Sequence, residues 1–292
     1  MKGNKMNQNH SSNWGWMLYT DFFLGALGGG LLIIGSLFIL FYGPDYTTIA
    51  TFVAPVIAMG LGSSMLVLEL GNPFRAWRVI TNPQSFLTIG AILMTLSIGL
   101  SVLLATFQIP ILPWSHLTGI QNMIAIIAIP TGLGVAFYPG LLLGGMNNRP
   151  FWRGPFLAPL FLLSGLSTGL VIFSFIDMVW SGNSAISPSL INKLNVFLLA
   201  LQIIGWVSYV HNKLNLPSTR EDSAMTNIFT GSRRLVFWGG FIGLGLVIPI
   251  IIYLSSLENL ATAAHVFVLI GAFMMRGFVV TADKGVPLEF SR

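Results

Sequence analysis

The chain has 292 residues, of which 54% are hydrophobic and only 8% are charged. An ordinary soluble domain carries roughly a quarter charged residues, so this composition cannot provide the polar surface of a water-soluble globule. At about 20 apolar residues per bilayer crossing, the length allows roughly eight to ten spanning helices and excludes a large extramembrane domain. Because the chain has no cysteine, it forms no disulfide and holds no cysteine-ligated iron–sulfur cluster of its own.

Apolar runs of about twenty residues mark the expected helices, because a segment in lipid must satisfy its own backbone hydrogen bonds. A polar segment, 1–16, precedes the first run. That run is longer than the apolar part of a signal peptide and lacks a small-residue cleavage site at its end, so we expect it to be retained. The eight expected spans are 17–42, 47–70, 86–107, 119–144, 156–180, 189–211, 232–256 and 260–282.

Eight spans place both termini on one side of the membrane, here called side A, and the opposite side is side B. All 14 basic residues except Lys193 then fall on side A. Cytoplasmic loops of membrane proteins are enriched in Lys and Arg, so this bias predicts that side A faces the cytoplasm. The sequence predicts an all-α integral membrane protein, with helices one to four in 17–144, helices five to eight in 145–282 and a tail at 283–292.

Two connections on side A, 68–86 and 144–159, are dense in Arg, Trp, Asn and Pro. An ordinary interfacial belt is the alternative interpretation, because Trp and Arg sit at lipid headgroups by amphipathicity alone. A belt does not require so many Pro and Asn residues to fix loop shape, so we favour a docking surface for a partner protein. The candidate docking residues are Trp77, Arg78, Asn147, Arg149, Trp152 and Arg153.

Acidic side chains within apolar spans are costly, so each is a candidate for function. Asp21 lies in the first turns of the first span, before the glycines 28–30. Its carboxylate could accept a proton or a ligand hydrogen bond, and an interfacial acid favoured by the helix dipole is an equal alternative. Glu69, at the side A end of the second span, either handles protons or pairs with a loop arginine such as Arg75.

Three further polar features lie in the spans. Tyr138 precedes Pro139, and a phenol at such an irregular point can hydrogen-bond a buried carbonyl, although an interfacial tyrosine is the simpler interpretation. The segment 164–169, SGLSTG, is typical of helix packing by small hydroxyl residues. Arg276 needs an anionic or carbonyl partner unless its side chain reaches the side A surface.

Several function classes have no support in the sequence. A membrane b-haem requires two histidines at similar depth, and His211 and His265 lie near opposite ends of their spans. No Walker loop, dinucleotide-binding glycine fingerprint, HExxH motif or nucleophile elbow occurs. The basic face borders a bilayer, so a nucleic-acid partner is not expected, nor is a metal site on this chain.

Five segments in this order resemble the NrfD-like family, the membrane subunits of polysulfide reductase and related respiratory oxidoreductases. They span most of the chain, and the two side A connections are the most specific among them. The segments are WGWMLYTDFFLGALGGG, LELGNPFRAWRVITNPQSF, YPGLLLGG, RPFWRGPFLAPLFLLSGLSTG and GAFMMRGFVV.

The resemblance implies an eight-helix anchor that binds a quinone, menaquinone or ubiquinone, within the bundle of helices one to four. The family's helix-four tyrosine matches Tyr138, its acid before the LG-x-P turn matches Glu69, and its loop arginines match Arg75 and Arg78. Asp21 matches the polar residue early in helix one. Electrons would pass to a ferredoxin-like iron–sulfur subunit and on to a molybdopterin subunit or a multihaem cytochrome.

Two physical points agree with this expectation. Quinone chemistry needs hydrogen-bond partners and proton-exchanging groups, and Tyr138, Asp21 and Glu69 all project to the side A ends of their helices. A chain without cysteine or paired histidines would also have to pass electrons to a neighbouring subunit. In exported members the iron–sulfur partner sits outside the cytoplasm, whereas the basic bias places side A inside, and this conflict stays open.

Two other functions remain open. A secondary transporter would use Asp21, Glu69 and Arg276 as coupling residues, but it would require two similar halves or paired broken helices, and helices one to four do not match helices five to eight. A structural anchor that has lost quinone binding is the other alternative. A quinone subunit is the leading hypothesis, with Asp21, Glu69 and Arg276 as candidates for proton transfer.

Overall fold

The computed structural model describes residues 14–69, 85–145, 151–152, 156–180, 187–214, 231, 234–255 and 258–282. Within this part of the chain, eight helices are long and apolar enough to cross a membrane, which confirms the predicted fold class of a multi-pass membrane protein. The spans are α1 (Trp14–Tyr42), α2 (Ile49–Glu69), α3 (Phe86–Phe107), α4 (Thr118–Gly144), α5 (Leu157–Trp180), α6 (Pro188–Leu214), η4 with α8 (Leu235–Val247 and Ile248–Leu254) and α9 (Ala261–Thr281).

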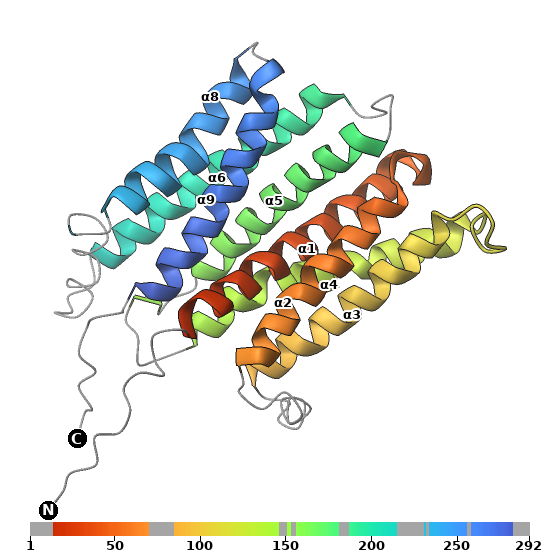
Figure 1. Cartoon of the computed structure of the whole chain (residues 1–292), viewed down its shortest axis with the longest axis horizontal. Helices are drawn as coiled ribbons and strands as arrows, with labels where there is room; N and C mark the ends of the chain where they lie inside the picture. Colours follow the sequence, from red (N-terminus) through yellow and green to blue (C-terminus); the bar gives the residue numbers. More distant parts are fainter. Residues whose placement is uncertain are drawn as a thin grey trace, which may run out of the picture.

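The helices form two groups of four that share a long central contact. In the first group α1 packs on α2 and α4, and α3 packs on the same two helices. The second group joins α5 to α6, α6 to α8, α8 to α9 and α9 back to α5. The start of α1 and the end of α9 lie at the same end of the molecule (Figure 1), as an even number of spans requires.

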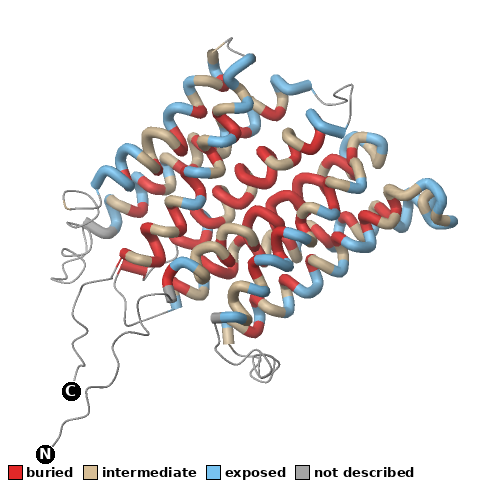
Figure 2. The backbone as a smooth tube through the Cα atoms, viewed as in Figure 1, coloured by how far each residue is buried: buried red, intermediate tan, exposed pale blue. Residues whose placement is uncertain are grey.

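Helix α1 is the central element of the fold. It contacts α2 and α4 in its own group and α5 and α9 in the other, and buried residues are concentrated along α1 and α5 (Figure 2). Glycines permit this packing, since a Cβ on Gly30 would lie 2.0 Å from the carbonyl oxygen of Gly165. Close backbone contact of this kind is typical of helix association in lipid, where no hydrophobic force drives helices together.

The seventh span departs from an ordinary α-helix. Its first part, η4, is a π-helix, and the amide of Ile248 donates to the carbonyl of Gly243, five residues earlier. In an α-helix the ring of Pro249 would clash with the carbonyl four residues before it, so the wider turns that precede this proline relieve the clash. Gly245 lies against Gly271 of α9, since a Cβ on Gly245 would be only 2.5 Å from the Gly271 Cα.

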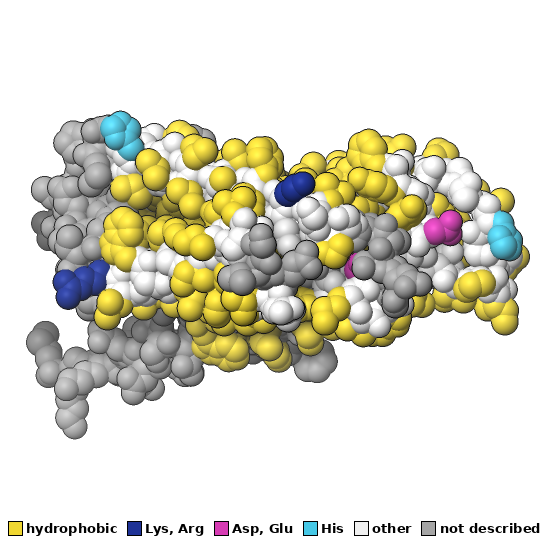
Figure 3. Space-filling view, turned by 90° about the horizontal axis from the view of Figure 1, so that it is seen from above, with side chains coloured by type: hydrophobic (Ala, Val, Ile, Leu, Met, Phe, Trp, Pro, Cys, Tyr) yellow, Lys and Arg dark blue, Asp and Glu magenta, His cyan; other side chains and the backbone are white. Residues whose placement is uncertain are grey.

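The outer surface fits a lipid environment. Large apolar side chains are exposed along the outer faces of the helices, among them Ile57, Leu96, Met123, Phe197 and Ile251. Hydrophobic side chains are widespread over the described part of the face seen in Figure 3, and few charged side chains are visible there. An exposed apolar surface of this extent marks contact with a membrane rather than with water.

Candidate functional site

A carboxylate and a phenol meet inside the first helix group. The hydroxyl of Tyr138 on α4 donates to Oδ2 of Asp21 on α1 at 3.2 Å. Both residues are buried, with exposed fractions of 4% and 0%. Asp21 lies seven residues after the start of α1, about 10 Å along the helix axis from its side A end.

Two glycines from the other helices of the group make room for this pair. A Cβ on Gly62 of α2 would lie 3.0 Å from Oδ1 of Asp21, and a Cβ on Gly90 of α3 would lie 2.6 Å from the ring of Tyr138. All four helices of the first group therefore contribute to the site. Neither glycine could be recognised as a site residue from the sequence, because each sits within a predicted membrane span that contains other glycines.

The position of Tyr138 is fixed from within α4. Pro139 follows it inside the helix, and a proline there has no amide to donate to the carbonyl of Val135. The next residue, Gly140, faces the backbone of α5, since a Cβ on it would lie 2.3 Å from the Cα of Ala158. The helix is thus locally irregular yet held closely against α5, and the phenol points toward α1.

Aromatic rings and a thioether close the site on its inner side. The ring of Phe22 stands edge-on to Tyr138 and to Phe161 of α5, with centroids 6.2 Å apart in each case. Met94 of α3 accepts a hydrogen bond from Ser63 at 3.3 Å. The pair therefore combines two polar groups with an apolar enclosure, which strengthens electrostatic interactions within it.

Arg276 lies on the other side of α1. Its Nε donates to the carbonyl of Phe22 at 3.1 Å, and its Nη1 donates to the hydroxyl of Ser164 at 3.0 Å and to the carbonyl of Ala272 at 2.9 Å. The side chain is fully buried, so it does not reach the surface as a snorkelling arginine would. It joins α9, α5 and α1, and the carbonyl that it contacts on α1 belongs to the residue that follows Asp21.

Trp152 is the one candidate docking residue that the structure describes. Its indole is buried, and Nε1 donates to the carbonyl of Val279 in α9 at 2.7 Å. The neighbouring carbonyl of Phe151 accepts a hydrogen bond from Tyr209 of α6. These two contacts fix the connection between α4 and α5 to the second helix group.

Other candidate residues cannot be placed. Glu69 is the last residue of α2, and its side chain lies outside the described part of the chain. The remaining loop candidates also lie outside the described residues; they are Arg75, Trp77, Arg78, Asn147, Arg149 and Arg153. Among the described residues no group of three or more metal-ligating side chains occurs.

Comparison with known proteins decides the family. The sequence pattern of the family described as polysulphide reductase, NrfD, matches residues 4–284. The chain belongs to the NrfD family. This confirms the resemblance found in the five sequence segments, and the match extends over nearly the whole chain.

A curated protein is also similar to this chain. The C subunit of polysulfide reductase from Wolinella succinogenes is 23% identical over 191 residues. The similar region covers 59% of this chain and 60% of that relative, so the chain matches less than two thirds of the length of the relative. For a member of the NrfD family, the Asp21–Tyr138 contact is a specific place to look for chemistry within the membrane.

Proposed function

We propose that this protein is the quinone-reactive membrane subunit of a multi-subunit respiratory oxidoreductase. Membership in the NrfD family and the similarity to the polysulfide reductase C subunit support this assignment. The single observation that carries the proposal is the buried hydrogen bond between Tyr138 and Asp21. An ionisable group inside a membrane span is costly and therefore marks function by default.

The donor and acceptor chemistry of the two side chains matches the head group of menaquinone or ubiquinone. A bound quinone supplies two-electron, two-proton redox chemistry. The hydroxyl of Tyr138, which donates its one proton to Asp21 in this structure, would turn to donate it to a quinone carbonyl oxygen, and the carboxylate of Asp21 can accept a proton. The ring of Phe22 stands edge-on to Tyr138, and such an apolar neighbour suits an apolar ligand.

Proton exchange with side A is the proposed role of the acidic groups. Asp21 lies about 10 Å from the start of α1, given the rise of an α-helix, and Glu69 ends α2 on the same side. We assign Glu69 to proton transfer between the pair and side A, and Arg75 to the rim of the quinone site. The end of α2 at Glu69 and the family resemblance of the segment that follows it support these two assignments.

Electron exchange requires a second subunit. The chain has no cysteine and therefore holds no cysteine-ligated cluster. A ferredoxin-like iron–sulfur subunit docked on side A would take up this role, next to the connection that Trp152 anchors. A molybdopterin subunit or a multihaem cytochrome would complete the complex, in the cytoplasmic membrane of a prokaryote with both termini inside.

Replacing Tyr138 by Phe tests the site. The ring would keep its contacts with Phe22 and Gly90, while the hydroxyl that reaches Asp21 would be lost. We expect quinol turnover by the assembled complex to fall about 100-fold, within the range of proton-transfer groups. Stopped-flow measurement of electron transfer from a quinol analogue checks this.

Tyr42→Phe is the matched control, because Tyr42 lies at the side B end of α1 and is half exposed. It should retain full turnover. Wild-type turnover in an assembled Tyr138→Phe complex would contradict the site. Purification in mild detergent tests the assignment itself, since an isolated, metal-free chain would contradict an iron–sulfur partner.

A further inference from the structure

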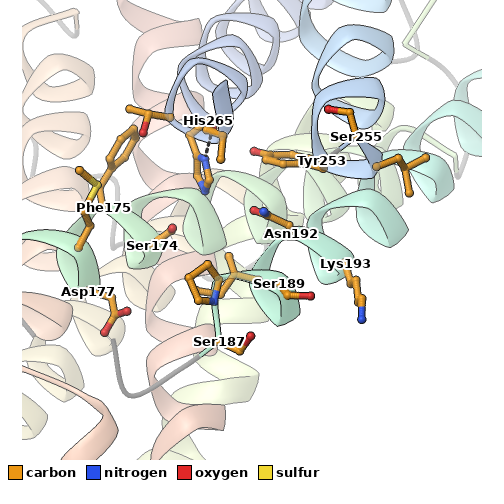
Figure 4. A pocket seen from close by; sticks show the side chains of 16 residues that line it. Ser174, Phe175, Asp177, Ser187, Ser189, Asn192, Lys193, Tyr253, Ser255 and His265 are labelled. Carbon is orange, nitrogen blue, oxygen red and sulfur yellow. Dashed lines mark hydrogen bonds between the residues drawn. The ribbon is translucent and has the colours of Figure 1, made fainter. Parts of the chain in front are cut away.

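A cavity of about 800 Å³ opens between the side B ends of α5, α6, α8 and α9. Polar side chains from all four helices face it, including Ser174, Asn192, Tyr253 and His265 (Figure 4). We call this cavity the side B vestibule. It lies at the opposite end of the molecule from the Asp21–Tyr138 pair and within the other helix group.

The vestibule contains groups that require water. The Nδ1 of His265 contacts the carbonyl of Ala261, whereas its Nε2 has no hydrogen-bond partner among the described residues. The hydroxyl of Tyr253 likewise has none there, and the two residues are only 4% and 9% exposed. Buried polar groups of this kind are normally satisfied by ordered water, and a cavity of this size and polarity has room for many molecules.

Polar side chains continue from the vestibule toward the centre of the membrane. Asn195 lies one helical turn deeper than Asn192, about 4.5 Å along α6, and accepts a hydrogen bond from Ser167 of α5 at 3.2 Å. Ser164 lies about 4.5 Å further along α5 and accepts from Arg276 at 3.0 Å. The side chains of Asn195, Ser167 and Ser164 are buried, and the Nδ2 of Asn195 has no hydrogen-bond partner among the described residues, so a proton would pass along them only with bridging waters.

Arg276 ends this polar file with a full positive charge. The acceptors of its hydrogen bonds are two backbone carbonyls and one hydroxyl, none of which is charged. The faces of Phe23 and Phe161 lie 5.6 and 5.5 Å from the guanidinium carbon. The Nη2 group has no hydrogen-bond partner in the described part of the chain, so it is available to a water of the file.

A guanidinium in this position opposes the movement of protons. It keeps its own proton and cannot relay one. Its charge is little screened in a low-dielectric core, and it repels an excess proton that approaches along the file. Positive groups exclude protons from water-filled membrane pores in the same way.

We propose that Arg276 is an electrostatic seal that stops protons from passing between the side B vestibule and the Asp21–Tyr138 pair. The seal matters because the polar file ends at the carbonyl of Phe22, the residue next to Asp21. Without the charge, the file would extend from side B to the neighbour of a residue that lies about 10 Å from the side A end of α1. The sequence suggested instead that Arg276 takes part in proton transfer. Replacing a residue that relays protons would not raise proton flux across the membrane, whereas replacing a residue that blocks protons would raise it.

Proton leak through the full chain in liposomes tests the seal without any quinone or partner. A pH-sensitive dye inside the vesicles reports proton flux under a potassium diffusion potential. Arg276→Gln removes the charge, and Arg276→Lys retains it. We expect Arg276→Gln to leak protons about tenfold or more above the wild type, because an unscreened unit charge acts strongly at this range, and Arg276→Lys to remain tight.

Ser164→Asp and Ser164→Asn form a second, matched pair that leaves the arginine in place. The aspartate would lie next to Nη1 of Arg276 and neutralise the positive charge, whereas the asparagine has the same size and carries no charge. Ser164→Asp should leak and Ser164→Asn should not, and this pair decides the question if Arg276→Gln does not fold. Two results would contradict the proposal. One is a proton leak in the wild type as large as that in Ser164→Asp, and the other is the absence of a leak in both Arg276→Gln and Ser164→Asp.

A further pair links the leak to the file. Asn195→Leu would place an apolar side chain between the vestibule and Ser164, so combining it with Ser164→Asp should restore tight vesicles. A leak that persists in this double variant would show another route and would contradict the proposed path. The leak assay contains no quinone, so its result is independent of the Tyr138→Phe experiment. Either proposal can be refuted without affecting the other.

Discussion

The two helix groups arrange their polar side chains differently. In the first group, the Tyr138 hydroxyl donates to the Asp21 carboxylate across a helix interface, and Gly62 and Gly90 bring two further helices close to the pair. In the second group, polar side chains surround a wide cavity. The first arrangement is a direct contact between packed helices, and the second is a cavity with room for water.

This difference supports the pair, rather than the cavity, as the proposed place of chemistry. A direct contact between two helices holds two groups in fixed positions, which proton and hydrogen-bond chemistry requires. A wide polar cavity gives access to solution but little orientation. Changes at the first region should therefore impair turnover, whereas equivalent changes at the vestibule should leave it intact.

The largest effect is expected from Asp21→Asn. The amide keeps the shape of the side chain but cannot accept a proton, so quinol turnover should fall by about 100-fold or more. Asp177→Asn, at the vestibule, is the matched change in the second region and should alter turnover less than about twofold. Steady-state quinol oxidation measures both, and equal losses in the two variants would erase the contrast between the regions.

A smaller effect is expected from Gly90→Ala. The added methyl would lie 2.6 Å from the ring of Tyr138, so the ring must leave its present position beside Asp21, and we expect turnover to fall about tenfold through lost orientation. Gly99→Ala is the control on the same helix, because nothing lies within 4 Å of a Cβ there. If both variants turn over equally, the packing of α3 does not position the phenol.

The smallest effect is expected from Trp152→Phe, which concerns the link between the regions. Loss of the indole donor leaves the carbonyl of Val279 buried without that hydrogen bond, at a cost of about 1–3 kcal/mol. The melting temperature in detergent should fall by a few degrees. Trp180→Phe, at an exposed position, should not change it, and an unchanged melting temperature for Trp152→Phe would show that this contact does not stabilise the fold.

The helices were predictable from the sequence, because their apolar length is imposed by the bilayer. The predicted span 86–107 coincides with α3, and the others agree closely with the described helices. The π-helical turns before Pro249 were not predictable from apolar length, because an apolar run does not show whether each amide reaches the carbonyl four or five residues earlier.

The candidate site was only partly predictable. Asp21 and Tyr138 were recognisable as polar residues in apolar spans, and their common side A position suggested proximity. Their direct contact depends on the rotation of α1 and α4, which pattern alone does not fix. The sequence did not single out Gly62, Gly90 or the residues of the vestibule. A glycine within a membrane span and a histidine near the end of one are both common without any functional role.

The central place of α1 has a consequence for biogenesis. Among the described helices α1 is synthesised before α5 and α9, which cover two of its sides. Asp21 obtains the hydrogen bond from Tyr138 only when α4 arrives, and the Phe22 carbonyl receives Arg276 only when α9 arrives. Until then the membrane-insertion machinery or surrounding water must accommodate a carboxylate in the membrane, so α1 reaches its final environment only after the helices that follow it are made.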